Sequence, residues 1–299
     1  MLKQRVITAV VLLAVLLPAL FAPQPVFFDA IMLVMVAAAA WEWGCLNGRR
    51  PLAKFSLVAW LGALGCVAAG LLIWHLGGLE RPLVELRWWW TGAGVFWVLV
   101  SGWLLSQGVS IWQRVPRGWR LGLGWLALLS AWWAVAQARG VGIEFLLSVL
   151  ALVWVADIAA YFVGRACGGR WIARKLAVHI SPGKTWEGAL GGLLGVVVLA
   201  AVWTGLTAGS SANSLYARLA QAGWPFALLA VLFLGAMSVA GDLVESLIKR
   251  AVGVKDSSGL LPGHGGVLDR IDALLPVLPL ALMLTAWLTP VSPALSAAA

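Results

Sequence analysis

The sequence is poor in charged residues and in cysteine. Asp, Glu, Lys and Arg make up 11% of its 299 residues, whereas soluble domains usually carry about 25%. The three cysteines, Cys45, Cys66 and Cys167, lie far apart and form no CxxC pair. That spacing matches neither a disulfide framework nor a thiolate zinc site. The sequence is therefore not typical of a soluble domain or of a zinc enzyme.

Hydrophobic residues make up 62% of the chain and occur in runs long enough to cross a hydrocarbon layer of ~30 Å as helices. A helix satisfies its own backbone hydrogen bonds in lipid, and the ~10-residue alternating segments of a membrane β-barrel are absent. We therefore predict an all-α, polytopic membrane protein with about nine transmembrane helices. The spans are expected near Val6–Phe21, Val26–Cys45, Phe55–Leu76, Trp88–Leu105, Leu121–Ala136, Phe145–Val163, Ala189–Leu206, Pro225–Ala240 and Ile271–Leu288.

The distribution of basic residues predicts the orientation. If nine spans alternate, all but four of the 21 Lys and Arg residues share one side with the N-terminus. The four exceptions are Arg81, Arg87, Arg139 and Arg218. Because cytoplasmic loops carry the excess of basic residues, we expect a cytoplasmic N-terminus in a protein of the inner membrane. A cleavable signal peptide is the alternative for Met1–Ala22. The net charge of +9 then reflects topology and attraction to anionic membrane lipids, and no nucleic-acid partner is expected.

The chain is expected to have two regions. Residues 1–140 contain five spans and no diagnostic motif, whereas residues 141–299 contain four spans and three polar clusters on the cytoplasmic side. In the first cluster, "ADIAAYFVGR", Asp157 lies about 12 Å deeper in the membrane than Arg165, at about 1.5 Å per helical residue. A carboxylate at that depth usually faces a partner or a water-filled cavity. Asp157 is thus a candidate binding residue, with an interhelical hydrogen bond or ion pair as the alternative.

The second cluster is "GGRWIARKLAVHISPGKTWEG". Its "GKT" is not a nucleotide P-loop, because Val178 stands where the first glycine is required and no strand precedes it. Ser181, Lys184 and Thr185 instead place two hydroxyls and an ammonium before a helix N-terminus, an arrangement that favours phosphate. The alternative is a Ser-Pro turn followed by a solvated lysine and a helix start.

The third cluster, "GDLVESLIKR", has polar residues at i, i+3, i+4, i+7 and i+8, which form one stripe on a helix. The stripe consists of Asp242, Glu245, Ser246, Lys249 and Arg250. Its carboxylates could hold a metal ion and its cations could bind phosphates. Ion pairing along a solvated helix face is the alternative.

A loop rich in Gly and Ser, "KDSSGLLPGHGG", follows the stripe and cannot continue the helix. His264 stands between glycines without an apolar surface to pack on, so we expect it to contact a phosphate or a carboxylate. Asp269 and Asp272 lie one helical turn apart and can face one cation. Oxygen ligands and scarce His and Cys favour Mg²⁺ over zinc, and a second cation is left open.

The segment "SLIKRAVGVKDSSGLLPGHGGVLDRID", Ser246–Asp272, resembles the signature of the phosphatidate cytidylyltransferases, also called CDP-diacylglycerol synthases. That pattern is S-x-x-K-R, four residues, K-D, a loop with H-G-G, and D-R-x-D. "DIAAYFVGR" and "SPGKTWEG" are similar to other recurring stretches of the family, in the same order. The resemblance covers Asp157–Asp272 and does not extend to the first 137 residues.

The resemblance implies a nine-helix, homodimeric membrane enzyme that converts CTP and phosphatidic acid into CDP-diacylglycerol and pyrophosphate with Mg²⁺. It makes residues 141–299 the catalytic region, and it implies that Asp242 and Asp269, with Asp272 as a further candidate, hold the metal. The other catalytic candidates are Lys249, Arg250 and His264. The candidate substrate-binding residues are Asp157, Ser181, Lys184, Thr185, Ser246, Lys255, Asp256 and Arg270.

The residues themselves suit this chemistry. The phosphate monoester of the lipid has a second pKa near ~6, so it is largely a dianion at neutral pH and needs little help from a general base. Catalysis would depend on positioning and on neutralising the repulsion between anions. Two alternatives remain: another CTP-dependent lipid-modifying enzyme, such as a lipid kinase, and a polytopic transporter of an anionic substrate.

Overall fold

The computed structural model describes residues 2–48, 56–207 and 213–290, and its regular elements are all helices. The long helices are α1 (Leu2–Phe21), α2 (Val26–Leu46), α3 (Leu57–His75), α4 (Arg87–Gln107), α6 (Arg117–Val141), α7 (Ile143–Cys167), α8 (Trp186–Leu206), α10 (Trp224–Ala251) and α12 (Leu274–Leu288). The short helices are α5 (Ile111–Arg114), α9 (Leu215–Ala220) and α11 (Leu268–Ile271). Each predicted span coincides with one long helix, which confirms the all-α fold. Phe55, the expected start of the third span, lies outside the described residues.

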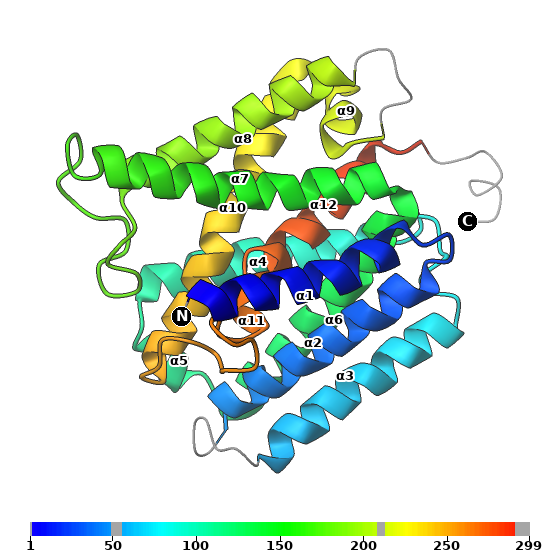
Figure 1. The fold of residues 1–299 in the computed structure, drawn as a ribbon, viewed down its shortest axis with the longest axis horizontal. Coiled ribbons are helices and arrows are strands. Elements are labelled where there is room, and N and C mark those ends of the chain that lie inside the picture. The colour runs from blue at the N-terminus through cyan, green and yellow to red at the C-terminus, as the bar shows by residue number, and fades with distance from the viewer. Residues whose placement is uncertain (1, 49–55, 208–212, 291–299) are drawn as a thin grey trace.

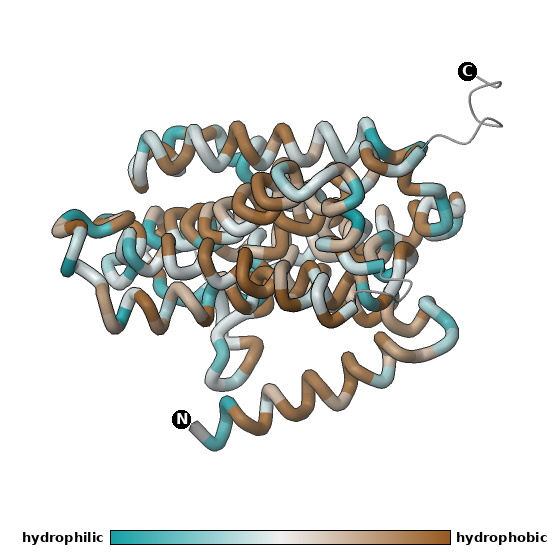
Figure 2. Tube along the Cα trace, turned by 90° about the horizontal axis from the view of Figure 1, so that it is seen from above, coloured by the Kyte–Doolittle hydropathy of each residue, from teal (hydrophilic) through white to brown (hydrophobic). Residues whose placement is uncertain are grey.

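Eight helical segments of the described chain are long and apolar enough to cross a membrane. The long helix that does not qualify is α4, because the tryptophans that begin it, Trp88–Trp90, have low hydropathy. The fourth predicted span is therefore a helix in the expected place with borderline hydropathy. Hydrophobic residues dominate the helices and hydrophilic residues concentrate towards their ends (Figure 2). This pattern is that of a polytopic membrane protein.

Helix α10 lies at the centre of the fold and packs against α4, α7, α8, α9 and α12 (Figure 1). It has 28 residues and is therefore about 42 Å long at 1.5 Å per residue. This exceeds the ~30 Å hydrocarbon core of a bilayer, so the last turns of α10 can extend beyond the core. Those turns carry Lys249 and Arg250.

Glycines allow α7 and α8 to pack with their backbones in close contact. A Cβ atom on Gly191 would lie 2.4 Å from Val163 Cβ, and one on Gly192 would lie 2.7 Å from the Ala156 carbonyl oxygen. Neither position can therefore carry a side chain, and small residues of this kind bring transmembrane helices together. The packing fixes the start of α8 against the end of α7.

Three polar segments gather at one end of the molecule: the start of α1, the α7–α8 loop (residues 168–185) and the α10–α11 loop (residues 252–267) (Figure 1). At this end, α1 contacts the α10–α11 loop and α2 contacts α11, so the two ends of the chain are neighbours. The polar clusters identified in the sequence lie here.

Candidate active site

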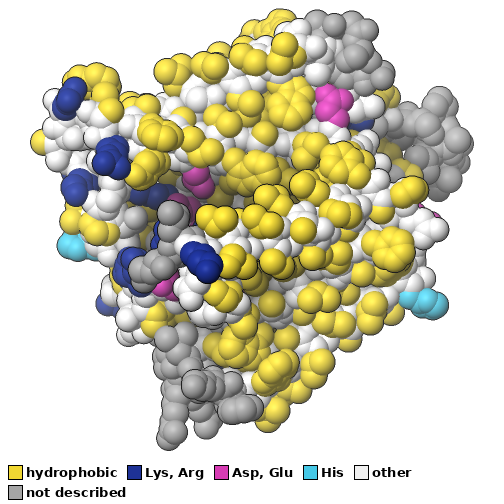
Figure 3. Space-filling model, in the orientation of Figure 1, with side chains coloured by type: hydrophobic (Ala, Val, Ile, Leu, Met, Phe, Trp, Pro, Cys, Tyr) yellow, Lys and Arg dark blue, Asp and Glu magenta, His cyan; other side chains and the backbone are white. Residues whose placement is uncertain are grey.

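A polar cavity of about 500 Å³ opens between α7, α8 and α10. The end of α7, the turn before α8 and the middle of α10 supply its polar side chains. These are Asp157, Tyr161, Arg165, Lys184, Thr185 and Asp242. In the orientation of Figure 3, acidic side chains lie in a hollow of the surface, and basic side chains lie on its left side and below it. The cavity therefore brings together residues from all three polar clusters.

Lys184 and Asp242 form an ion pair in the cavity, and their side chains are 25% and 27% exposed. The hydroxyl of Ser246 donates a hydrogen bond to Asp242 Oδ1 at 3.3 Å. Asp157 is exposed to the cavity and lies within electrostatic reach of Asp242 and Lys184. We call Asp157, Lys184 and Asp242 the open cluster. Its accessible, oppositely charged groups could exchange their present partners for a ligand.

Thr185 has a structural role as well as a place in the cavity wall. Its side-chain oxygen accepts a hydrogen bond from the Gly188 N–H at 3.1 Å, which makes it the N-cap of α8. The sequence left open whether this residue starts a helix or binds phosphate. The structure shows the helix start, and the hydroxyl can still donate a hydrogen bond into the cavity.

A second group of charges is buried one turn further along α10. Lys249 Nζ lies 2.5 Å from Glu245 Oε2 and 2.7 Å from Asp269 Oδ1. Asp269 also accepts backbone hydrogen bonds from Ser257 at 3.0 Å and from Gly266 at 2.7 Å. We call Glu245, Lys249 and Asp269 the closed cluster. Because Asp269 receives donors from two separate parts of the α10–α11 loop, its carboxylate holds these parts of the loop together.

Glu42 of α2 holds the same loop from the other side. Its carboxylate is fully buried and accepts hydrogen bonds from the Val267 N–H at 3.0 Å, the Leu268 N–H at 2.7 Å and the Ser257 hydroxyl at 3.2 Å. The Ser258 hydroxyl donates to it as well. A buried carboxylate is stable when donors surround it in this way. Glu42 therefore ties the α10–α11 loop to the N-terminal half of the chain.

Helix α1 reaches the tip of the α10–α11 loop. The Arg5 guanidinium donates to the Gly263 carbonyl and the Thr8 hydroxyl donates to the Pro262 carbonyl, both at 2.9 Å. Gly263 and Gly265 have φ values of 78° and 82°, a region that favours glycine. The turn that carries His264 is thus set by two glycines and by α1.

Glu187 at the start of α8 holds the α7–α8 loop in a similar way. Its Oε1 atom accepts hydrogen bonds from the backbone N–H groups of Gly169, Trp171 and Ile172, at 3.1, 3.1 and 2.9 Å. Each of the two polar loops is therefore anchored by a buried glutamate.

The comparisons with known proteins agree over nearly the whole chain. A family model described as "Cytidylyltransferase family" matches residues 3–288. The chain belongs to the cytidylyltransferase family. It is 38% identical to a protein of Pseudomonas aeruginosa named phosphatidate cytidylyltransferase, covering 93% of this chain and 95% of the relative. A protein of that name from Haemophilus influenzae is 36% identical, covering 93% and 96%. The chain is therefore a nucleotidyltransferase, and the expected family resemblance is confirmed.

The family match includes the N-terminal half, where the sequence motifs had shown nothing. Glu42 is the residue that sequence reasoning missed. Its signal was a lone carboxylate near the cytoplasmic end of the second predicted span, in "WEWG", where an ionisable residue usually has a partner or a function. The division of this cytidylyltransferase at residue 140 stays a prediction, but the contacts of Arg5, Thr8 and Glu42 cross it.

The structure distributes the predicted site residues over several places. Asp157, Lys184, Thr185 and Asp242 line the polar cavity, and Ser246 contacts Asp242. Ser181 is half-buried in the turn before Lys184.

The remaining candidate residues of the α10–α11 region do not line the cavity. Arg250 donates to the Ile180 and Val254 carbonyls at 3.3 and 3.2 Å, so it joins the two polar loops. Lys255, Asp256 and Arg270 are exposed, and Arg270 lies within electrostatic reach of Asp157. His264 is half-buried, and its Nδ1 atom has no hydrogen-bond partner among the described residues.

The predicted metal ligands differ in their contacts. Asp272 lies within electrostatic reach of Asp242 and Asp157, whereas both oxygens of Asp269 already accept hydrogen bonds. Within the described ranges, no three His, Cys, Asp or Glu side chains form a group that could hold a metal ion. Mg²⁺ commonly uses one or two protein carboxylates and takes its other ligands from water and substrate phosphates. The partly exposed carboxylate of Asp242, with Asp272 within electrostatic reach, fits such an ion.

Proposed function

We propose that this nucleotidyltransferase transfers the cytidylyl group of CTP to phosphatidic acid in phospholipid biosynthesis, with release of CDP-diacylglycerol and pyrophosphate. The observation that carries the proposal is the polar cavity, in which a lysine and carboxylates from separate helices meet at one end of the membrane spans. A reaction between a lipid phosphate and a soluble nucleotide needs such a place. The names of the relatives support these two substrates.

In the proposed reaction, a phosphate oxygen of phosphatidic acid attacks the α-phosphorus of CTP in line. The new P–O bond forms while the bond from the α-phosphorus to the bridging oxygen breaks, and that oxygen leaves with pyrophosphate. Because both reactants are anions, positioning and charge neutralisation are the main requirements. Lys184 and Arg165 would bind phosphate oxygens in the cavity, and the Thr185 hydroxyl would donate a hydrogen bond.

Magnesium is part of the proposal. Asp242 would hold the ion together with Asp272, after one of its oxygens exchanges Ser246 or Lys184 for the ion. Asp269 would act as a ligand after a similar exchange of one of its present donors. When bound, Mg²⁺ would reduce the repulsion between the phosphates and stabilise the leaving pyrophosphate. We infer a cytoplasmic active site in the inner membrane, because most Lys and Arg residues belong to that end of the predicted topology.

The test uses the purified full chain in detergent with labelled CTP and phosphatidic acid, with and without Mg²⁺. We expect equal amounts of CDP-lipid and pyrophosphate, and no turnover when EDTA removes the metal. Phosphorylation of diacylglycerol with release of CDP would instead identify a lipid kinase. A folded protein without turnover that moves an anion across vesicles would identify a transporter. The homodimer expected from the family resemblance is tested on the same preparation by light scattering.

A further inference from the structure

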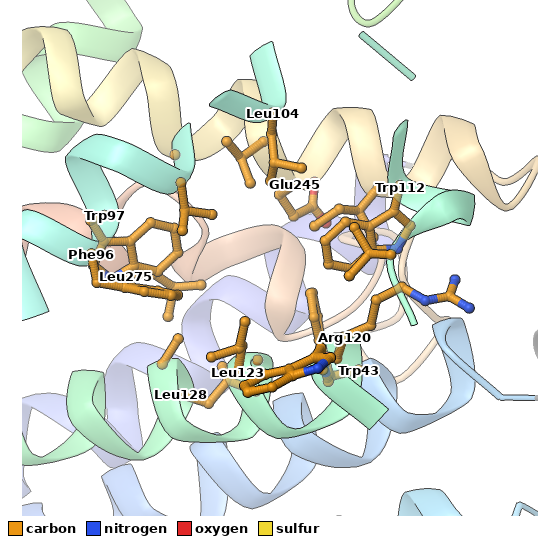
Figure 4. Close-up of a pocket in the computed structure, with 18 of the residues that line it drawn as sticks. Trp43, Phe96, Trp97, Leu104, Trp112, Arg120, Leu123, Leu128, Glu245 and Leu275 are labelled. Atoms are coloured by element: carbon orange, nitrogen blue, oxygen red, sulfur yellow. The ribbon is translucent and has the colours of Figure 1, made fainter. Parts of the chain in front are cut away.

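An apolar groove runs between α4 and α6, on another face of α10 from the polar cavity. One part of it is a cavity of about 110 Å³, and a neighbouring part is a cavity of about 240 Å³. The two cavities share four lining residues: Phe96, Trp97, Leu123 and Ala127. Helices α4 and α6 both pack on α12 but barely touch each other. The groove is therefore the space that these two helices leave open, and Figure 4 shows its aromatic walls.

The groove is distinct from the polar cavity. Residues in a helix are spaced by about 100°, so Val244 and Ile248, which line the groove, project roughly 160° and 120° away from Asp242, which lines the polar cavity. Glu245 lies between these two faces and lines the groove while it pairs with Lys249. A molecule in the groove would therefore contact the closed cluster without entering the polar cavity.

Basic side chains lie at the end of the groove near the polar loops. Arg120 lines this end, and its guanidinium is directed away from the apolar walls (Figure 4). Its Nε atom is buried and has no hydrogen-bond partner among the described residues. Arg114 and Arg117 are close to it in the chain, and no ion pair joins any of the three to a described carboxylate. This end can therefore accept an anion.

The walls of the groove favour an acyl chain. They consist mostly of aromatic and aliphatic side chains of α4 and α6, which suit a hydrocarbon chain. The opposite end of the groove is open, since Gly92 is exposed and a Cβ atom there would meet nothing within 4 Å. A flexible chain could enter along α4 and fill the narrow space.

We propose that the α4–α6 groove binds an anionic diacyl phospholipid that is not consumed in the reaction. One acyl chain lies between α4 and α6, and the phosphate contacts Arg120. A headgroup with net negative charge complements the unpaired arginines, because clustered basic residues near a membrane surface attract anionic lipids. The proposal concerns lipid binding alone and does not depend on the proposed function.

The test is native mass spectrometry of the full chain in detergent, titrated with phosphatidylglycerol or with phosphatidylcholine of the same acyl chains. We expect tighter retention of phosphatidylglycerol. The variant Gly92→Leu places a side chain in the groove and should lower the retention of both lipids. Gly102→Leu is the matched control, since Gly102 also lies exposed on α4 with open space around it but does not line the groove.

Arg120→Gln should lower the preference for phosphatidylglycerol over phosphatidylcholine by about fivefold. This is the effect on affinity of one basic residue near an anionic surface. The same variant should lower phosphatidylcholine retention less, because the choline ammonium already balances the charge of that phosphate. If Gly92→Leu does not fold, Ser130→Leu fills the groove from α6, where the buried hydroxyl has no partner among the described residues.

Three results would overturn the proposal. Equal retention of the two lipids by the wild type would show that the arginines do not select an anionic headgroup. Unchanged lipid retention in the folded groove-filling variant would show that the lipid does not bind in the groove. Conversion of a dimer to a monomer by that variant, with lipid retention intact, would show that a second copy of the chain covers the groove.

Discussion

The open cluster and the closed cluster contain the same kinds of side chain, but they differ in access. Lys184 and Asp242 keep about a quarter of their side-chain surface exposed, whereas Glu245 and Asp269 keep 5% and 4%. Asp242 and Glu245 are only three residues apart on α10. The comparison shows that neighbouring carboxylates on one helix can differ in role, because one faces a cavity and the other faces packed helices.

The largest expected effect is on stability, from Lys249→Met in the closed cluster. Removing this ammonium leaves Glu245 and Asp269 buried without their cation, which costs roughly 3–5 kcal/mol when a buried pair is broken. The thermal unfolding temperature in detergent measures the loss. The exposed Lys255→Met is the stability control and should unfold like the wild type. A Lys249→Met protein of unchanged unfolding temperature would contradict the closed-cluster assignment.

In the open cluster, Asp242→Asn should lower turnover by about 100-fold or more, the scale of losing one main electrostatic contact in an active site. Its unfolding temperature should stay close to that of the wild type, because the side chain faces the cavity. Asp269→Asn should lower turnover to a similar extent and should also unfold at a lower temperature, since the amide replaces an acceptor of several donors. Equal unfolding temperatures for the two variants would show that the closed cluster contributes no more to stability than the open cluster.

Added Mg²⁺ gives a second test of the difference between the open and closed clusters. A ligand that binds only the folded protein raises its stability by about 2.7 kcal/mol at 100 times its Kd. We expect added Mg²⁺ to raise the unfolding temperature of the wild type and to leave that of Asp242→Asn unchanged. A full magnesium response in Asp242→Asn would remove this residue from the metal site.

Glu42→Gln tests the anchor of the loop next to the closed cluster. The amide can accept hydrogen bonds through only one of its two terminal atoms, so one or more buried donors lose their partner at about 1–3 kcal/mol each. Hydrogen exchange of the Val267 and Leu268 amides should speed up more than that of the Trp171 and Ile172 amides. Equal changes in both loops would show a general loss of stability.

The smallest expected effect is that of Arg5→Gln at the tip of the same loop. The exposed hydrogen bond to the Gly263 carbonyl contributes on the order of 1 kcal/mol. Exchange of amides in the turn around His264 should speed up slightly, and the unfolding temperature should fall by a few degrees at most. Lys3→Gln, an exposed lysine on the same helix, should leave the turn as it is.

The sequence predicted the convergence of the clusters better than their internal contacts. Alternating spans placed Asp157, Lys184 and Asp242 on one side of the membrane, and they line one cavity. Helical periodicity placed Asp242 and Glu245 in one stripe, but it could not show which of them would be buried, because burial depends on the helices that pack against α10.

The partners of the loop anchors could not be predicted, for a different reason. Glu42 contacts Ser257, 215 positions later in the chain, and periodicity within one helix says nothing about such a distant partner. The same holds for Arg5 and Gly263. Asp269 matched the expected motif, but its backbone donors come from a loop whose conformation depends on left-handed glycines and on these distant contacts.

The contact between α1 and the tip of the α10–α11 loop has a practical consequence. A purification tag or fluorescent fusion attached ahead of α1 would lie beside the turn that carries His264, where added bulk could displace it. The end of α12 lies on the far side of the molecule (Figure 1), so carboxyl-terminal labels are the better choice for biochemical work on this enzyme.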